Sequence, residues 1–196
     1  MNSTDYYDKN AQDFTDRTIN HDMSDSYNQF LELLPKKASI LDAGCGPGRD
    51  AIYFNKLGHD VTAFDASIEM VKISTQKLGQ PTLQMSLQDL SFENQFDGVW
   101  ANASLLHVPF EELRDVFEKM YRSLKPAGIL YVSFKYGNDI RPVEGRTFYD
   151  MDEKTILPYV EGLFEVLKFW QTEDTFSWVA RSPANAWLRV LCKKHL

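Results

Sequence analysis

Short apolar runs of strand length alternate with helical patterns between residues 38 and 135. Apolar side chains that recur every three or four residues predict helices, whereas short runs rich in apolar and β-branched residues predict strands. A regular alternation of the two is typical of a parallel α/β sheet. The expected strands are Ser39–Ala43, Asp60–Asp65, Thr82–Ser86, Gln95–Ala101 and Gly128–Lys135, with helices between them at Asp50–Leu57, Ile68–Leu78 and Phe110–Leu124.

Two segments precede this predicted core. Asp25–Leu34 has the spacing of a helix, and Pro35 is expected to end it because proline cannot continue the backbone hydrogen bonding. The upstream segment Tyr6–Arg17 is polar and aromatic, which fits neither a core helix nor a disordered tail. We expect this segment to form a lid over a bound ligand.

The segment after the fifth predicted strand has a different character. Tyr136–Asp150 is polar, rich in turn-forming residues and too long for a simple connection, so we expect a functional loop or a lid. A short helix at Glu153–Glu161 should follow. Two more apolar runs, Phe164–Gln171 and Trp187–Lys193, are joined by a loop and not by a helix, which predicts an antiparallel pair.

Composition narrows the class of protein. The chain has 196 residues, 43% hydrophobic and 25% charged, which predicts a single folded domain, and its net charge of −7 argues against nucleic acid as a partner. No apolar stretch reaches the roughly 18 residues that span a bilayer. Because the N-terminus does not resemble a signal peptide, we expect a cytoplasmic protein with no membrane partner. Cys45 and Cys192 are expected to be free thiols, and no metal site is indicated by the spacing of cysteines and histidines.

The first predicted strand runs into a glycine-rich turn, Asp42-Ala43-Gly44-Cys45-Gly46-Pro47-Gly48, which is followed by a helix. Glycines at these positions let the backbone approach a ligand closely, although a tight turn with no ligand has the same pattern. A dinucleotide-binding turn would have a third glycine where Arg49 stands, and bulk there crowds a pyrophosphate. The turn therefore favours a ligand without phosphates, and it argues against a nicotinamide-dependent oxidoreductase.

Two acidic residues follow neighbouring strands. Asp65 ends the second predicted strand, where a carboxylate can accept both hydroxyls of a ribose. Asp89 follows the third strand, where it could accept a hydrogen bond from an adenine amino group. Either residue alone could instead be a helix cap or a loop carboxylate. Taken together with the glycine-rich turn, the two acids predict a nucleoside pocket.

From Ala38 to Leu196 the chain resembles the class I S-adenosylmethionine-dependent methyltransferases. Within that family the opening residues look like those of small bacterial tellurite-resistance-type enzymes. The resemblance implies a Rossmann-like, doubly wound α/β sheet of seven strands, mostly parallel, with a reversed antiparallel C-terminal hairpin. It is carried by the D-x-G-x-G-x-G turn, Asp65, Gln88-Asp89-Leu90, Phe96-Asp97-Gly98-Val99-Trp100 and Leu124-Lys125-Pro126-Ala127-Gly128-Ile129-Leu130.

The resemblance also implies a set of S-adenosylmethionine contacts. Met70 would cover a face of the adenine, although core packing is an alternative. From the lid, Tyr7 would shield the methyl donor, and Arg17 would either pair with the methionine carboxylate or lie in solvent. The other implied contacts are Asp42, Gly44, Gly46 and Gly48 for the methionine part, Asp65 and Ala66 for the ribose, Asp89 and Leu90 for the adenine, and Asn102 and Leu105 near the sulfonium.

The expected function is methyl transfer to a small-molecule acceptor, and a non-catalytic S-adenosylmethionine-binding regulator is the alternative. His107 is a candidate general base or a simple helix cap. The cations of the predicted acceptor wall could steer a small anion or could merely pair with surface acids. The residues expected in this wall are Tyr136, Arg146, Tyr149 and Trp178. The single domain would comprise a helical lid segment (1–36), a cofactor-binding core (37–135) and a substrate-side stretch with the C-terminal hairpin (136–196).

Overall fold

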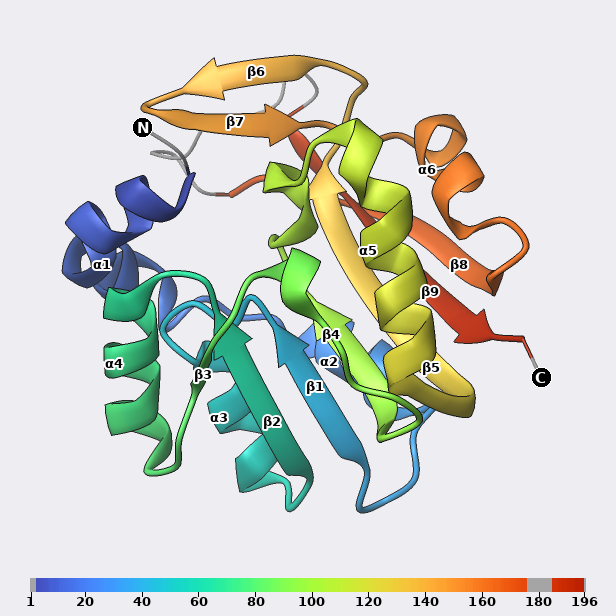
Figure 1. Ribbon diagram of the computed structural model, residues 1–196, viewed down its shortest axis with the longest axis horizontal. Coiled ribbons are helices and arrows are strands. Elements are labelled where there is room, and N and C mark those ends of the chain that lie inside the picture. Colours follow the sequence, from blue (N-terminus) through green and yellow to red (C-terminus); the bar gives the residue numbers. More distant parts are fainter. Residues whose placement is uncertain (1–2, 176–184, 196) are drawn as a thin grey trace.

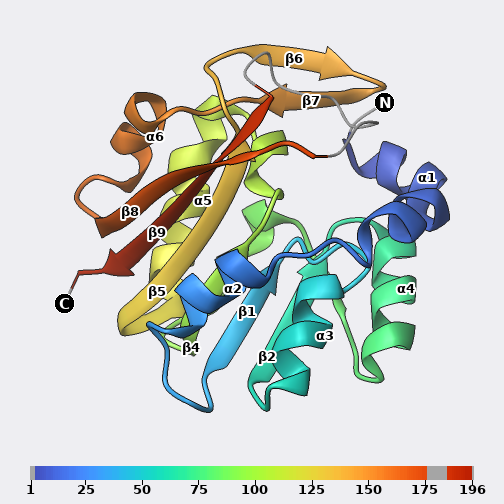
Figure 2. The same ribbon diagram turned by 180° about the vertical axis from the view of Figure 1, so that it is seen from behind.

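The computed structural model describes residues 3–175 and 185–195, and a seven-stranded sheet forms its centre (Figures 1 and 2). The strand order is β3-β2-β1-β4-β5-β9-β8. Strands β1 to β5 run parallel, and β9 lies antiparallel between β5 and β8. This confirms the predicted fold class. The strands are β1 (Ser39–Ala43), β2 (Asp60–Asp65), β3 (Leu83–Gln84), β4 (Phe96–Ala101), β5 (Leu124–Lys135), β8 (Phe164–Glu173) and β9 (Ala186–Lys194).

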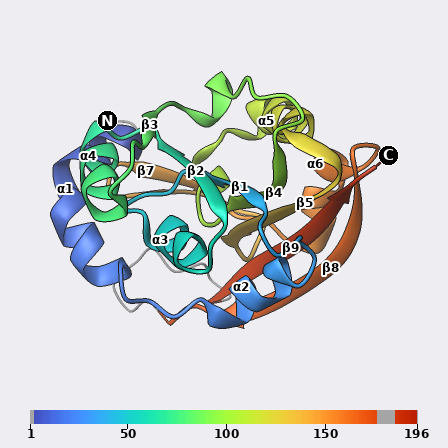
Figure 3. The same cartoon turned by 90° about the horizontal axis from the view of Figure 1, so that it is seen from below.

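Helices cover both faces of the sheet. Helices α2 and α3 lie against one face and α5 and α6 against the other, while α1 and α4 lie at the β3 edge (Figure 3). The α-helices are α1 (Ser3–Thr18), α2 (Ser24–Leu31), α3 (Arg49–Lys56), α4 (Ile68–Leu78), α5 (Phe110–Ser123) and α6 (Glu153–Val160), and two 3₁₀ turns are η1 (Leu87–Asp89) and η2 (Leu105–His107).

The core has two parts because side chains alternate between the faces of each strand. On the α2/α3 face, Trp100 and Tyr131 stack with ring centroids 3.8 Å apart, and Phe30 packs against both rings. On the opposite face, Leu130 and Val132 join the aliphatic and aromatic side chains of α5 in a second buried cluster. The sheet is therefore buried on both faces near its centre, as a parallel sheet requires.

The structure departs from the sequence prediction in several places, one of which is the start of β5, at Leu124 and not at Gly128. β3 has only two residues instead of five, and α2 ends at Leu31, three residues earlier than predicted. The polar stretch after β5 contains a separate hairpin, β6 (Ile140–Val143) and β7 (Arg146–Tyr149). Glu144 and Gly145 form its two-residue turn with φ of +52° and +80°, the backbone that tight hairpins require. This hairpin and α1 lie above the carboxyl ends of the parallel strands (Figure 1).

The contact between α2 and β4 gives a first prediction. A Cβ on Gly98 would lie 2.6 Å from Cζ of Phe30 and 3.0 Å from Cδ1 of Leu34. Because Phe30 is fully buried, Gly98→Ala should lower the free energy of unfolding by about 1–3 kcal/mol through overpacking. Urea unfolding of the wild-type protein, of Gly98→Ala, of Phe30→Leu and of the double mutant measures this change in free energy. The cost of Gly98→Ala should shrink in a Phe30→Leu background, and an equal cost in both backgrounds would contradict the proposed clash.

Candidate active site

A cavity of about 590 Å³ lies where the parallel strands end. Its wall is built from α1, the glycine-rich turn after β1, the end of β2, the segment after β4, strand β7 and the start of β9. Cavities of this volume hold small molecules, and the carboxyl ends of parallel strands are where open α/β sheets bind their ligands. The position and size make this the candidate active site.

The glycine-rich turn forms one wall because its backbone adopts conformations that favour glycine. Gly44 has φ of +75°, and a Cβ there would lie 2.5 Å from Cβ of Ser104. Gly46 has φ of +53°, and a Cβ there would meet only Phe14, at 3.9 Å. Since Gly46 lines the cavity, its missing side chain leaves room for a ligand to approach the backbone.

Asp65, at the end of β2, is held by the turn on one side and by the start of α4 on the other. Its Oδ2 accepts a hydrogen bond from the Gly46 amide at 2.8 Å, and its Oδ1 accepts one from the Ser67 amide at 2.9 Å. Burial raises the pKa of this carboxyl group above its usual value. Each carboxylate oxygen can accept a further hydrogen bond, so the group is placed to receive two ligand hydroxyls.

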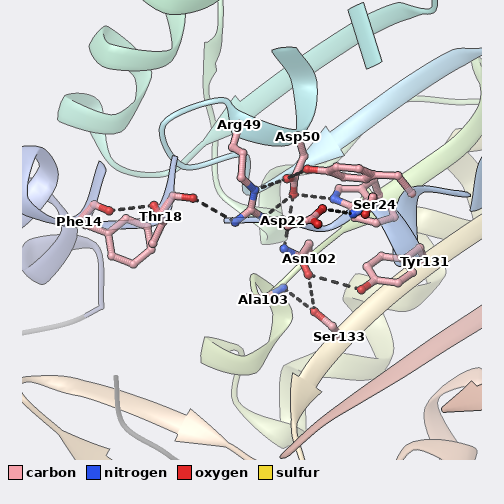
Figure 4. A network of polar contacts seen from close by, with 12 residues as sticks. Phe14, Thr18, Asp22, Ser24, Arg49, Asp50, Asn102, Ala103, Tyr131 and Ser133 are labelled. Carbon is pink, nitrogen blue, oxygen red and sulfur yellow. Dashed lines mark hydrogen bonds and ion pairs between the residues drawn. The ribbon is translucent and has the colours of Figure 1, made fainter. Parts of the chain in front are cut away.

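A buried network of polar contacts starts at the beginning of α3 (Figure 4). Arg49 donates from Nε to Oδ1 of Asp50 at 2.5 Å, and Asp50 also accepts from the Tyr27 hydroxyl at 2.5 Å and from Nε1 of Trp100 at 2.7 Å. Burial opposes the charged form of Asp50, but Arg49 and these donors hold its pKa below the usual value. Arg49 also reaches the Thr18 carbonyl of α1 at 3.5 Å, so it joins α1 to the cavity wall.

Asn102 continues this network across the sheet. Its Nδ2 donates to Oδ2 of Asp50 at 3.4 Å, and its Oδ1 accepts from the Ser133 hydroxyl at 2.8 Å and the Tyr131 hydroxyl at 3.5 Å (Figure 4). The Tyr131 oxygen in turn accepts from Nη1 of Arg189 at 2.5 Å. One chain of hydrogen bonds therefore links the start of α3 to strand β9, with Asn102 and Arg189 both in the cavity wall.

His107 is fixed by contacts on both ring nitrogens. Its Nδ1 lies 2.8 Å from the Thr147 carbonyl oxygen, which can only accept, so Nδ1 carries the hydrogen. Its Nε2 lies 2.9 Å from the Tyr7 hydroxyl and therefore accepts from it. Burial, together with the nearby Arg146 guanidinium, lowers the pKa of His107 to about 4. At neutral pH His107 is thus uncharged and joins α1, η2 and the β6–β7 hairpin.

Three more contacts hold α1 over the cavity. The Ser67 hydroxyl donates to Oδ1 of Asp8 at 2.5 Å, and the Glu69 amide donates to the same oxygen at 3.3 Å. The guanidinium carbon of Arg146 lies 3.8 Å from the centre of the Tyr6 ring. Helix α1 is therefore attached to both α4 and β7, and it contributes Tyr7 to the cavity wall.

The structure brings together most of the residues predicted from the sequence. Ten of the eighteen named above line the cavity: Tyr7, Gly44, Gly46, Asp65, Ala66, Met70, Asn102, His107, Arg146 and Tyr149. Trp178 lies outside the described residues.

Two predicted lid and adenine contacts point elsewhere in the structure. Arg17 does not line the cavity; it is 44% exposed and forms an ion pair with Asp13 at 2.8 Å. Asp89 turns back to accept a hydrogen bond from the Ser86 hydroxyl at 2.6 Å, while the preceding Gln88 lines the cavity instead.

The remaining predicted contacts lie behind the wall or outside it. Leu90 and Leu105 are buried in the apolar core, and Asp42 is buried beneath the turn, where desolvation raises its pKa. Gly48 has φ of +86° and serves as the N-cap of α3. The Tyr136 hydroxyl donates to Glu153 at 3.1 Å, away from the cavity.

Sequence reasoning missed many residues of the wall, among them Arg49, Thr147 and Arg189. Arg49 was interpreted only as an obstacle to a pyrophosphate, and no site role was predicted for Thr147 or Arg189. A signal existed for Arg189, because a lone arginine inside the apolar run from Trp187 to Cys192 is seldom buried without a partner. Within the described residues there is no group of three metal-ligating side chains, and no helix is long and apolar enough to cross a bilayer.

Known proteins with similar sequences are methyltransferases. Residues 41–132 match the family model for a methyltransferase domain. The chain is 33% identical over 150 residues to the putative methyltransferase YqeM of Bacillus subtilis, covering 70% of this chain and 60% of that one. It is 35% identical over 109 residues to a malonyl-[acyl-carrier protein] O-methyltransferase of Enterobacter lignolyticus, covering 54% and 43%. The chain therefore spans 60% or less of these relatives' own lengths.

Solved structures share the fold. One is the 1,6-didemethyltoxoflavin-N1-methyltransferase of Burkholderia thailandensis with bound S-adenosylhomocysteine, with a TM-score of 0.77, 23% identity, and 98% of this chain and 87% of that one covered. Another is a magnesium protoporphyrin IX methyltransferase from Synechocystis with bound S-adenosylmethionine, with a TM-score of 0.71, 22% identity, and coverage of 97% and 94%.

The sheet order, the glycine-rich turn and Asp65 define a nucleoside-binding α/β protein. These matches confirm the resemblance to the class I S-adenosylmethionine-dependent methyltransferases that the sequence shows, and S-adenosylmethionine is the cosubstrate of those enzymes. The described residues fit this molecule, because Gly46 leaves an open approach and Asp65 has unused acceptor positions. The closer relation to tellurite-resistance-type enzymes stays a prediction.

Asp65 provides a test of the cofactor site. Asp65→Ala should weaken S-adenosylhomocysteine binding at least about tenfold, because hydrogen bonds to a charged group contribute about 1.5–3 kcal/mol each. Isothermal calorimetry measures the affinity. Asp60→Ala is the matched control, since Asp60 is the exposed residue at the other end of β2. An unchanged affinity in Asp65→Ala would remove Asp65 from the ribose site.

The lid also predicts a measurable response to ligand. Polar contacts of α1 to α4, η2 and β7 can open locally, so amide hydrogen exchange across residues 5–18 should slow when S-adenosylhomocysteine fills the cavity. Exchange in α5, which lies outside the cavity wall, serves as the internal control. The same exchange rates at residues 5–18 with and without ligand would show that α1 is a fixed wall.

Proposed function

We propose that the protein transfers the methyl group of S-adenosylmethionine to a small-molecule acceptor bound in the same cavity. The observation that carries this proposal is the continuity of the cavity, which extends from Gly46 and Asp65 to His107, Arg146 and Tyr149. The sulfonium of the cosubstrate supplies an activated methyl group when it is bound. The protein then has to position an acceptor and exclude water, which needs no catalytic triad.

The residues of the cavity divide into two sets by their chemistry. On the cofactor side, Asp65 would accept the ribose hydroxyls, Gly46 would allow close backbone approach, and the Arg49 cation would favour the methionine carboxylate. On the acceptor side, Tyr7 of the lid and Tyr149 of β7 would enclose the second ligand.

A small molecule suits this enclosure better than a macromolecule. Helix α1 and the β6–β7 hairpin both cover the carboxyl ends of the strands (Figure 2), and the net charge of −7 disfavours nucleic acid and anionic membrane surfaces. The relatives named above act on different acceptors by their names, so likeness to them supports the cosubstrate and does not select an acceptor.

A direct transfer assay tests the proposal against a non-catalytic binding role. The protein should move labelled methyl groups from S-adenosylmethionine into the small-molecule fraction of a cell extract, and Asp65→Ala should reduce the transfer in step with its weaker binding. Binding of S-adenosylhomocysteine with no transfer to any fraction would favour the regulatory alternative. Binding of NAD in its place would overturn both readings.

A further inference from the structure

Arg146 on β7 is buried with an unused hydrogen-bond donor. The residue is 2% exposed and lines the cavity. Its Nη2 donates to Glu144 at 3.0 Å, but the Glu144 side chain is 60% exposed, and Nε has no acceptor among the described residues. The Tyr6 ring, whose centre lies 3.8 Å from the guanidinium carbon, offsets part of the cost of burying the cation, but a buried donor without an acceptor remains costly. The guanidinium is therefore suited to a ligand that brings negative charge.

No described carboxylate of the cavity wall is placed to satisfy that donor. Asp50 is engaged by Arg49, Tyr27 and Trp100, and Asp65 is engaged by the backbone of the glycine-rich turn and of α4. The titratable groups that face Arg146 come from α1, from η2 and from its own hairpin, and they are Tyr6, Tyr7, His107 and Glu144.

The imidazole beside Arg146 is not free to take a proton from an acceptor. His107 donates from Nδ1 to the Thr147 carbonyl and accepts at Nε2 from Tyr7, so both nitrogens are occupied while the lid is closed. The other histidine in the wall, His21, lies near Arg49 and Arg189, at the far end of the polar network. An acceptor at Arg146 therefore has to arrive with its nucleophile already ionised.

We propose that the acceptor is a small organic oxyanion, such as a carboxylate, held by the guanidinium group of Arg146 and methylated in its ionised form. This inference rests on the proposed methyl transfer. The ionised oxygen forms the new O–CH₃ bond while the S–CH₃ bond breaks, and that electron pair remains on sulfur, converting the sulfonium to a thioether. No proton moves. The methyl ester or ether formed has lost the charge that paired with Arg146, which favours its release.

Matched probes test the charge requirement on the native protein. Saturation-transfer NMR with the S-adenosylhomocysteine complex should detect binding of millimolar benzoate and little binding of the isosteric, neutral benzamide. Equal signals from the two probes, or no signal from benzoate, would overturn the proposal.

Variants of the hairpin separate anion binding from a structural role. Arg146→Gln should weaken benzoate binding at least about tenfold, and Arg146→Lys should restore it only in part, because lysine keeps the charge but lacks the planar, forked donors of the guanidinium. Glu144→Gln is the matched control, since it removes the ion pair but leaves the donor. If Glu144→Gln lost benzoate as Arg146→Gln does, the pair would be structural and the proposal would fail. Unchanged S-adenosylhomocysteine affinity in all three variants shows that they fold.

An extract experiment distinguishes failure of this inference from failure of the proposed function. Small molecules of an extract are separated on an anion-exchange column, and each fraction is offered with labelled S-adenosylmethionine. Label should enter the retained, anionic fraction. Label that enters only the unretained fraction would overturn the oxyanion proposal while methyl transfer stands, whereas no label in either fraction would overturn methyl transfer itself.

Discussion

The buried carboxylate of Asp50 constrains the floor of the cavity more than any other group does. A buried charge is tolerated only when hydrogen bonds and an opposite charge compensate for lost hydration. Here the donors come from separate elements: Tyr27 from α2, Trp100 from β4, Asn102 from the segment after β4, and Arg49 from the start of α3 itself. The position of α2 against the sheet, the aromatic stack beneath it and the orientation of Arg49 in the cavity wall all follow from satisfying this one group.

The attachment of α1 is of a different kind. Of its sixteen residues only Ala11, Thr15 and Thr18 are buried, and its links to the rest of the molecule are mostly single polar or ring contacts. Apolar burial contributes little to such an interface, so its free energy of opening is expected to be low. Under the proposed function, a segment attached in this way can open to admit ligands, whereas buried hydrogen bonds hold the floor around Asp50 in place.

The sequence predicted what depends on local pattern and missed what depends on packing between distant segments. Gly44, Gly46 and Asp65 were placed correctly in the wall because the backbone of one βαβ unit positions them. The prediction for Arg17 was wrong. The face of α1 that lines the cavity carries Tyr7, Phe14 and Thr18, and Arg17 points away from this face because it is next to Thr18 in the helix. The alternation of polar and apolar residues in β6 and β7 is too short to distinguish these strands from a loop in the sequence. The Glu144-Gly145 turn is the sequence feature that indicates the hairpin.

The two halves of the cavity also differ in where they lie along the chain. The cofactor side, from Gly44 to the residues after β3, falls within the 41–132 segment that matches the methyltransferase family model. Tyr7, Arg146 and Arg189 lie outside that segment, on α1, the hairpin and β9. The family match therefore carries information about the nucleoside but little about the acceptor. Acceptor choice has to be read from side chains such as Arg146, which packs against the Tyr6 ring and pairs with Glu144 but keeps an unused donor that these contacts do not explain.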